Sequence, residues 1–349
     1  MKILVLNAGS ASLKYKLFDR QKEKYGGKIE GDPHLSFKKL LDKSQFLFEG
    51  INAIGHRVVN GGDEFFTPTL MAETNLKKLE KYNKMTPLHN PPAILVIRDC
   101  LKAGLQPNYA CFDTAFHQTM IDEAKTYPLP LTLTKKYKIQ RFGFHGLSHQ
   151  YIAQMHRDCD RLISVHLGQG CSVCAIKKGK SIDTSMGFTP LEGLPMITRS
   201  GSIDPAIIIY LQKEAGFVPS KISEILNNES GIAALAGTND DFREILASAE
   251  YKVEDPHFTL KKQLSNQDIE RARFAISYFV YQVAKAIGAY ITALQGADKI
   301  VFTGEIGAGS GLIREKIQAY FPYLERVRFE AMYTNEELII AQSIEKCLK

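Results

Sequence analysis

The sequence predicts an α/β protein that consists of two related domains. Its 349 residues suit two compact domains, because domains typically contain about 100–200 residues. Short apolar runs that are typical of strands alternate with helical patterns through both halves, as in the α/β class. A strand–turn–strand pattern at residues 2–19 also returns at residues 161–180, which indicates one copy of a duplicated unit in each domain.

The two copies share a turn of small residues between two apolar strands. The first turn, residues 7–12, reads Asn-Ala-Gly-Ser-Ala-Ser, and the second, residues 166–172, reads His-Leu-Gly-Gln-Gly-Cys-Ser. Glycine and small hydroxyl residues let backbone N–H groups approach an anion closely. Either turn alone is best interpreted as an ordinary hairpin, but the repetition favours a pair of phosphate-binding loops.

The last third of the chain predicts a buried helix, then a strand and a glycine-rich loop. Apolar residues recur with helical spacing from 276 to 294, which predicts a helix with one buried face. Residues 299–303 read as a strand, residues 304–310 as a glycine loop, and a further helix is expected from Leu312. This order suits a nucleotide contact, although the loop matches neither the phosphate-loop motif nor the dinucleotide motif.

Two long irregular stretches interrupt these elements, at residues 86–92 and 186–205. Both are rich in Pro and Gly and are too long to be simple connections. Loops of this length in a compact protein are usually functional or disordered, and these are too apolar to be disordered. We therefore expect both to contribute to a site.

Composition excludes several classes of protein. The 44 basic and 38 acidic residues leave a net charge of +6 that is spread along the chain, so no nucleic-acid partner is expected. Lys285 divides the longest apolar stretch, residues 274–297, into runs of 11 and 12 residues, whereas a membrane-spanning helix needs about 20. The N-terminal apolar run is also too short for a secretory signal, so we expect a cytoplasmic protein with reduced cysteines and no membrane contact.

Five polar residues stand in apolar or turn settings: Arg57, His89, Asp113, His145 and Arg199. A single His or Asp in such a setting is more often structural than catalytic. Two arginines among apolar or small neighbours are different, because burying a guanidinium is costly unless an anion pairs with it. Glycine turns for phosphates, arginines for an anion, a histidine, and carboxylates for a metal together favour phosphoryl transfer.

The motifs around these residues resemble the acetokinase family, within the superfamily of acetate and sugar kinases, Hsp70 and actin. The motifs that carry the resemblance are Asn7-Ala-Gly-Ser-Ala-Ser-Leu-Lys14, Gly55-His-Arg-Val-Val-Asn-Gly-Gly62, Pro87-Leu-His-Asn-Pro91, Phe112-Asp-Thr-Ala-Phe-His117, Phe142-Gly-Phe-His-Gly-Leu-Ser-His149, Asp183-Thr-Ser-Met-Gly-Phe-Thr-Pro-Leu-Glu-Gly193, Thr198-Arg-Ser-Gly201 and Thr334-Asn-Glu-Glu-Leu338. They occur in the family's order from Asn7 almost to the C-terminus, which makes the resemblance specific.

The resemblance implies two ribonuclease-H-like (actin-like ATPase) domains around a central cleft. The first would comprise residues 1–115 with the C-terminal helix 336–349, and the second, nucleotide-binding domain would comprise residues 116–335. It also implies a homodimer that transfers the γ-phosphoryl group of ATP directly and reversibly to acetate, giving acetyl phosphate and ADP. The implied metal is Mg²⁺ or Mn²⁺.

The resemblance also implies four catalytic residues. Arg57 and Arg199 would hold the carboxylate and the phosphoryl group in transfer. His145 would donate a hydrogen bond to a phosphoryl oxygen, and Asp113 would orient the reactants. A carboxylate with a reference pKa of about 4 is already ionised at neutral pH and needs no general base. We therefore expect Asp113 to position groups rather than to accept a proton.

The other site residues that the resemblance implies fall into four groups. The metal ligands would be Asn7 and Glu336, with His89 and Asp183 in supporting positions. A small apolar pocket for the acetate methyl would be lined by Val59, Leu88, Phe144 and Pro190. The nucleotide would contact Ser10, Ser12, Lys14, His166, Gly168, Gln169, Gly170, Gly304, Glu305, Ile306 and Gly307.

The chain departs from the family mainly on the nucleotide side. The family's loop Thr-Ala-Gly-Ile-Gly-Glu-Asn-Ser appears here as Thr303-Gly-Glu-Ile-Gly-Ala-Gly-Ser310, so Glu305 replaces a glycine. Such a carboxylate could narrow the adenosine groove, contact the ribose, or select another donor such as pyrophosphate or a different nucleoside triphosphate. The chain is also some tens of residues shorter than is usual. Other departures are Asn60, Leu147, Gln169, Pro195, Ile197 and Ser202.

Alternatives to an ATP-dependent acetate kinase therefore stay open. A propionate or butyrate kinase differs only in pocket volume, because one methylene changes discrimination by about 1–3 kcal/mol. An acetate kinase with another phosphoryl donor is the second alternative. A non-catalytic nucleotide-binding relative, or a chaperone or filament protein of the same fold, is the third. The retained set of two arginines, Asp113 and His145 favours an enzyme, because a binding module would not need it.

Overall fold

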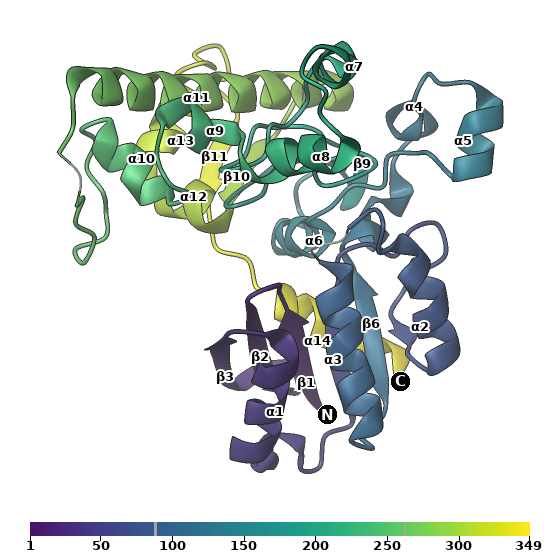
Figure 1. The fold of residues 1–349 in the computed structure, drawn as a ribbon. Helices are drawn as coiled ribbons and strands as arrows, with labels where there is room; N and C mark the ends of the chain where they lie inside the picture. The colour runs from purple at the N-terminus through teal and green to yellow at the C-terminus, as the bar shows by residue number, and fades with distance from the viewer. Residues whose placement is uncertain (87–88, 262) are drawn as a thin grey trace. The chain divides into compact units, whose positions relative to one another are not determined.

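The structure is a computed structural model that describes residues 1–86, 89–261 and 263–349. The chain forms two compact units: the first comprises Met1–Met155 and Asn335–Lys349, and the second comprises His156–Thr334 (Figure 1). Each unit contains its own β-sheet. Leu88, which was predicted for the acetate pocket, lies outside the described residues.

The first unit is built on a six-stranded sheet in the order β3-β2-β1-β4-β6-β5. Its strands are β1 (Lys2–Ala8), β2 (Ser12–Asp19), β3 (Lys22–Glu30), β4 (Ala53–Val58), β5 (Thr69–Leu70) and β6 (Asn108–Phe112). β2 pairs antiparallel with both β1 and β3, whereas β4 runs parallel to both β1 and β6. The carboxyl ends of β1, β4 and β6 therefore lie along the same edge of the sheet.

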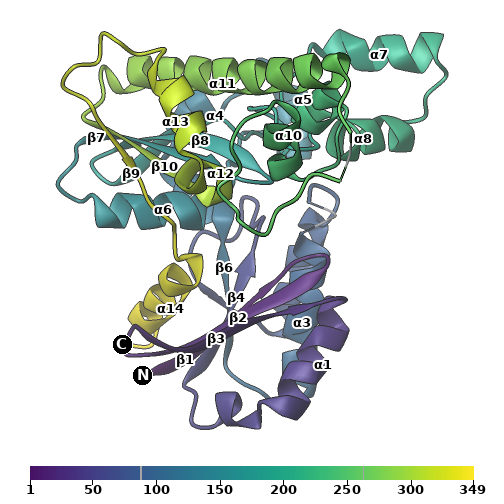
Figure 2. The same cartoon turned by 90° about the vertical axis from the view of Figure 1, so that its left-hand side faces the viewer.

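Helices cover both faces of this sheet. Leu4 and Leu6 of β1 pack with helices α1 (Pro33–Lys43) and α3 (Asn90–Lys102). Ile3 and Val5 pack on the opposite face with α14 (Glu336–Cys347) and α6 (Gly146–Met155) (Figure 2). Successive residues of a strand point to opposite faces, so the uninterrupted apolar run of β1 is what a sheet buried on both sides requires. The unit also contains α2 (Glu73–Leu79), α4 (Asp122–Lys125), α5 (Leu131–Tyr137) and the 3₁₀ helices η1 (Gln45–Phe48), η2 (Glu80–Tyr82) and η3 (Asp113–Thr119).

The second unit repeats the strand order of the first. Its five-stranded sheet has the order β11-β10-β7-β8-β9. The strands are β7 (Arg161–Leu167), β8 (Cys171–Lys177), β9 (Lys180–Thr184), β10 (Lys299–Thr303) and β11 (Arg328–Ala331). β8 is antiparallel to β7 and β9, while β10 is parallel to β7 and β11. The hairpin β7–β8 thus corresponds to β1–β2, which confirms the predicted α/β class and the pair of ribonuclease-H-like domains.

The long helix predicted near the C-terminus is the core helix of the second unit. It is α11 (Asn266–Leu294), and it begins at a capping box in which Ser265 and Asp268 satisfy free backbone N–H groups. By length and composition α11 could cross a membrane, but its apolar residues Ile276, Phe279 and Ile287 are buried in the unit, where the helix contacts β8 and α9. The other helices are α7 (Pro205–Glu214), α8 (Pro219–Asn228), α9 (Gly231–Ala236), α10 (Phe242–Ser248), α12 (Gly304–Gly309) and α13 (Gly311–Gln318).

The prediction of a glycine loop at residues 304–310 is wrong, because this segment forms helix α12 and leads directly into α13. Gly304 has a φ of +79° and turns the chain out of β10, where a Cβ would lie 2.4 Å from the carbonyl oxygen of Leu167. Ile306 is then buried under the new helix. Burial of this side chain stabilises a helical turn that the glycine content alone disfavours.

Residues 116–155 group with the first unit, whereas the sequence analysis places the domain boundary after residue 115. The physical reason is that α6 packs against η3 and α14 of that unit, with Leu147 in a cluster that contains Ile339. The C-terminal residues Asn335–Lys349 also group with the first unit. Residues 186–204 form neither helix nor strand, as predicted, but in the other predicted loop α3 already begins at Asn90.

Candidate functional site

The first unit brings three predicted site residues into one ionic cluster, formed by Arg57, Asp113 and Glu336. Arg57 lies near the carboxyl end of β4, and Asp113 follows directly after β6, its parallel neighbour. The Nε and Nη2 of Arg57 donate to the two carboxylate oxygens of Asp113, at 3.1 and 2.7 Å. Nη1 lies 3.0 Å from an oxygen of Glu336, the first residue of α14. The N-terminal end of α14 therefore contributes to the same site as the carboxyl ends of β4 and β6.

Burial makes the electrostatics of this cluster strong. The side chain of Asp113 is 1% exposed, that of Glu336 14% and that of Arg57 20%. Burial by itself lowers the pKa of Arg57, but the charges of Asp113 and Glu336 outweigh it, so the net pKa of Arg57 is raised. Burial, which outweighs the attraction of Arg57, raises the pKa of Glu336 to about 7. Arg57 stays charged, while Glu336 titrates near neutral pH.

Asn7 is linked to the cluster through Glu337, a residue that the sequence analysis did not assign to the site. Its Nδ2 donates to Oε1 of Glu337 at 3.0 Å, and Glu337 also lies 3.9 Å from the ammonium group of Lys16. Glu337 is buried, and its acidic neighbour Glu336 occupies the first turn of the same helix. A pair of acidic residues at a helix start is a signal that the sequence already contains. Lys14 lies opposite Asn7 in the β1–β2 pairing.

The donor set of this cluster fits a hard divalent cation. Asn7 uses its amide nitrogen on Glu337, which leaves its amide oxygen as the remaining acceptor, and Glu336 and Glu337 supply carboxylates. Mg²⁺ prefers oxygen ligands and usually keeps several waters and substrate phosphate oxygens. Within the described part of the chain, no group of three or more His, Cys, Asp and Glu side chains is arranged to hold a metal by itself.

His145 is distant from Arg57, Asp113 and Glu336 in sequence, but its backbone segment lies next to their cluster. It adopts a left-handed conformation with a φ of +55°, directly before α6. A Cβ on the following residue, Gly146, would lie 1.7 Å from the carbonyl oxygen of Asp113, so the two segments are in close contact. His117 fixes the same segment, because its Nε2 lies 2.9 Å from the carbonyl oxygen of Phe144. The structure thus brings the backbone of His145 and Asp113 together.

The remaining predicted residues of the first unit are less closely grouped. Phe144 is 1% exposed, so its ring belongs to the interior, and Val59 is half-buried just after β4. His89 immediately precedes α3, with its backbone N–H donating to the carbonyl oxygen of Thr86 at 3.1 Å. Ser10, Ser12 and Lys14 form or follow the turn between β1 and β2.

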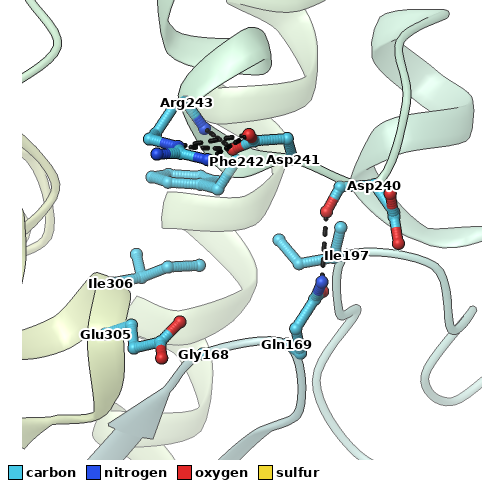
Figure 3. A pocket seen from close by; sticks show the side chains of 9 residues that line it. All are labelled: Gly168, Gln169, Ile197, Asp240, Asp241, Phe242, Arg243, Glu305 and Ile306. Atoms are coloured by element: carbon cyan, nitrogen blue, oxygen red, sulfur yellow. Dashed lines mark hydrogen bonds and ion pairs between the residues drawn. The ribbon is translucent and has the colours of Figure 1, made fainter. Parts of the chain in front are cut away.

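The second unit contains a cavity of about 560 Å³ that four of the predicted nucleotide residues line (Figure 3). These are Gly168, Gln169, Glu305 and Ile306. The first two come from the β7–β8 turn and the last two from α12. Gly170, Gly304 and Gly307 lie in the same two segments and His166 lies in β7, but none of the four lines the cavity. Two segments that are far apart in sequence therefore form one pocket.

The opposite wall of this pocket was not predicted. It consists of Ile197 and residues 240–243, which lead into α10. Asp241 caps that helix by accepting from the backbone N–H of Arg243 at 2.9 Å, and Gln169 donates to the backbone oxygen of Asp240 at 3.2 Å. The signal for this wall in the sequence was a run of polar residues directly before an apolar helix. Arg243 also pairs with Asp241 and Asp255, each at 2.7 Å.

Arg199 lies in the irregular stretch of the second unit with Pro190. Its Nη1 donates to the carbonyl oxygen of Pro190 at 3.5 Å and to the sulfur of Met196 at 3.7 Å. Burial lowers the pKa of Arg199. Asp183, at the end of β9, accepts from the backbone N–H of Thr184 at 2.7 Å. Because Arg57 and Arg199 belong to different units, their approach to one another stays a prediction.

Comparison with known proteins identifies relatives over the whole chain. The model of the acetokinase family matches residues 33–330. An acetate kinase of Carboxydothermus hydrogenoformans is 38% identical, over an alignment that covers 98% of each chain. That alignment spans 406 residues, so the relative contains segments that this chain of 349 residues does not.

Solved structures agree with the sequence comparison. A propionate kinase from Francisella tularensis subsp. tularensis SCHU S4 is 34% identical, with a TM-score of 0.85 over 98% of both chains. The acetate kinase of Porphyromonas gingivalis is 30% identical, with a TM-score of 0.84 over 100% of both chains.

Proposed function

The chain belongs to the acetokinase family and is a kinase, and we propose that it transfers the γ-phosphoryl group of ATP to acetate, giving acetyl phosphate and ADP. The observation that carries this proposal is the cluster of Arg57, Asp113 and Glu336 in the first unit. Asp113 and Glu336 fix the guanidinium of Arg57 in place, and its remaining N–H groups can donate to an anion. The nucleotide pocket of the second unit supports the same proposal.

Arg57 acts by neutralising charge in the proposed reaction. The obstacle to the transfer is repulsion between the acetate anion and the phosphate chain, and a fixed guanidinium removes part of it. The planar group carries five N–H donors, so it can hold Asp113 and Glu336 and still present donors to an anion. Asp113 orients Arg57 through two hydrogen bonds and needs to accept no proton, since acetate is already ionised at neutral pH. Arg199 and His145 supply further donors.

Asn7, Glu336 and Glu337 are the residues that would hold Mg²⁺. The bound cation would neutralise charge on the phosphate oxygens. Glu337 fixes the amide of Asn7 by accepting from its Nδ2 at 3.0 Å, so the amide oxygen keeps one orientation. Mn²⁺ accepts the same oxygen ligands.

The pocket of the second unit favours a nucleotide as the phosphoryl donor. Its volume of about 560 Å³ lies within the usual range for small-molecule sites, about 300–1,000 Å³. Pyrophosphate has no sugar or base and would need no such cavity beside the β7–β8 turn. The backbone of residues 166–170 would contact the phosphates, and the ring of Phe242 would offer an apolar surface to the base.

Propionate is the second candidate acceptor, because one of the solved structures similar to this chain is that of a propionate kinase. Val59, Phe144 and Pro190 are the described residues proposed to line the pocket for the acid. One methylene changes discrimination by about 1–3 kcal/mol. Values of kcat/KM for acetate, propionate and butyrate, measured side by side, decide between the two acids.

We also propose a cytoplasmic homodimer. Helix α7 exposes Ile207, Ile209 and Tyr210, and Val218 is exposed close to its end. Exposed apolar residues that gather on one helix mark contact surfaces. Light scattering coupled to size-exclusion chromatography tests the dimer: a mass of about twice the 39.1 kDa of the chain supports it, and a mass equal to that of the chain contradicts it.

The central experiment is an assay for acyl phosphate with hydroxylamine. The full chain is incubated with acetate, MgCl₂ and either ATP or pyrophosphate, and hydroxamate is expected with ATP. Arg57→Ala should abolish most of the signal. The matched control is Arg98→Ala, because Arg98 pairs with Glu73 and Glu80 at the surface. Hydroxamate from neither donor would contradict the proposed function, and hydroxamate from pyrophosphate alone would contradict the proposed donor.

A further inference from the structure

Asn90 is a buried asparagine whose side chain bonds to a loop that is distant in sequence. It is the first residue of α3, and the loop comprises residues 59–62, which follow β4 (the β4 loop). Oδ1 of Asn90 accepts from the backbone N–H of Asn60 at 3.0 Å, and its Nδ2 donates to the backbone oxygen of Asn60 at 2.9 Å. Both residues are 0% exposed. The amide of Asn90 therefore pairs with the β4 loop as a neighbouring strand would.

Thr114 holds the next residue of the β4 loop from another element. Its Oγ1 accepts from the backbone N–H of Gly61 at 3.0 Å, and it is also 0% exposed. Thr114 belongs to η3 and directly follows Asp113. A Cβ on Gly61 would lie 2.8 Å from the ring of Phe112, so the loop fits closely against the end of β6. The β4 loop is thus fixed both to α3 and to η3.

These bonds are made by covalent neighbours of the proposed site for the acid. Val59 directly precedes Asn60, and Arg57 lies two residues before Val59, on β4. Asp113, whose oxygens accept from Arg57 at 2.7 and 3.1 Å, directly precedes Thr114. A displacement of the β4 loop is therefore passed on to the groups proposed to bind the acid. A misplacement of about 1 Å can lower a rate about 100-fold.

We propose that Asn90 and Thr114 are positioning residues, which fix the β4 loop and thereby hold the proposed acid-binding groups in place. This inference rests on the proposed function, which supplies the acid. Both residues act through the backbone of the loop rather than on the reactants. Asn60 supports them, because its Oδ1 accepts from the backbone N–H of Gly62 at 2.8 Å and closes the turn. Loosening the loop should weaken binding of the acid, whereas the nucleotide pocket is built from other residues.

Steady-state kinetics with the hydroxylamine assay test this on the full chain. Asn90→Ala removes both bonds to Asn60, so KM for acetate should rise roughly 10- to 100-fold, while KM for ATP should stay close to wild type. Thr114→Val keeps the shape of the side chain but leaves the buried N–H of Gly61 unpaired, so it should also raise KM for acetate. Thr114→Ser keeps the hydroxyl and should leave KM for acetate near the wild-type value.

Asn108→Ala is the matched control. Asn108 is also a buried asparagine of the first unit, its Oδ1 lies 2.8 Å from Nε2 of His56, and its Nδ2 donates to the carbonyl oxygen of Leu105. It begins β6, whereas Asp113 follows the last residue of that strand. Asn108→Ala should therefore lower Tm without raising KM for acetate. A loss of folded protein alone lowers the apparent kcat and leaves KM unchanged.

The outcomes that overturn this inference are distinct from those that overturn the proposed function. A wild-type KM for acetate in Asn90→Ala and Thr114→Val refutes the positioning role alone, provided that the wild-type chain is active. An equal rise of KM in Asn108→Ala or Thr114→Ser refutes it as well, because general loosening would then explain the rise. If Asn90→Ala does not fold, the comparison of Thr114→Val with Thr114→Ser decides. A wild-type chain that forms no acyl phosphate from acetate or propionate refutes the proposed function, and this inference with it.

Discussion

Removing Arg57 should damage stability and activity by separable routes. In Arg57→Ala the carboxylate of Asp113, which is 1% exposed, loses its two hydrogen bonds of 2.7 and 3.1 Å. Breaking a buried ion pair from one side costs about 3–5 kcal/mol. At about 2–4 °C per kcal/mol, Tm should fall by about 6–20 °C.

A second substitution separates the two routes. The double variant Arg57→Ala, Asp113→Ala removes the unpaired buried carboxylate and should recover part of the lost Tm. It should not recover kcat, which we expect to be about 10²–10³-fold below wild type in both variants, as for the loss of a fixed transition-state donor.

Calorimetric Tm and the rate of hydroxamate formation are the assays. Arg98→Ala is the control, since exposed pairs contribute only about 0–1 kcal/mol. A double variant with the same Tm as the single variant would refute the buried-pair reasoning. Wild-type kcat in either variant would refute the role of Arg57 in the transfer.

Three further predictions concern the same fold. Burial raises the pKa of Glu336 from 4.5 to about 7, so between these two pH values the folded state binds more protons than the unfolded state. The metal-free chain should therefore lose stability as the pH rises from 4.5 to about 7. Glu336→Gln should flatten that profile in urea unfolding at pH 5 and 8 with EDTA, and an unchanged slope would contradict the assignment. Gly146→Ala should sharply reduce folded yield and activity, because the new Cβ would lie 1.7 Å from the carbonyl oxygen of Asp113; a soluble, fully active variant would contradict this. Of the six cysteines, Cys347 is exposed and the other five are buried, and burial raises the pKa of Cys171 to about 12. A thiol reagent should therefore react quickly with one cysteine of the native chain. Rapid reaction of several cysteines would contradict the described burial.

The parts of the fold that could be predicted are those with a local signal. The strand–turn–strand copies at 2–19 and 161–180 and the helix that includes Ile276 and Ile287 follow from apolar periodicity alone. Helix α12 was missed because its glycines suggest a loop, whereas the burial of Ile306 is a tertiary effect. Local composition could not reveal that burial.

The site shows the same division. Motif resemblance selected Arg57, Asp113 and Glu336 one by one, and the structure joins all three. It also selected residues on two sides of the second unit's pocket, Gly168 and Glu305. The wall at residues 240–243 was missed, because a polar run before a helix is common and gains meaning only from what lies opposite.

By itself, the sequence determined the class of the fold, the duplication and the family, because these depend on the order of residue types along the chain. Only the tertiary structure decided that Asp113 holds Arg57 through two hydrogen bonds, that Glu337 accepts a hydrogen bond from Asn7, and that Glu305 borders a pocket shared with Phe242. Such contacts join residues far apart in sequence, and their energies depend on burial and on distances of a few ångströms. No local pattern encodes those two quantities.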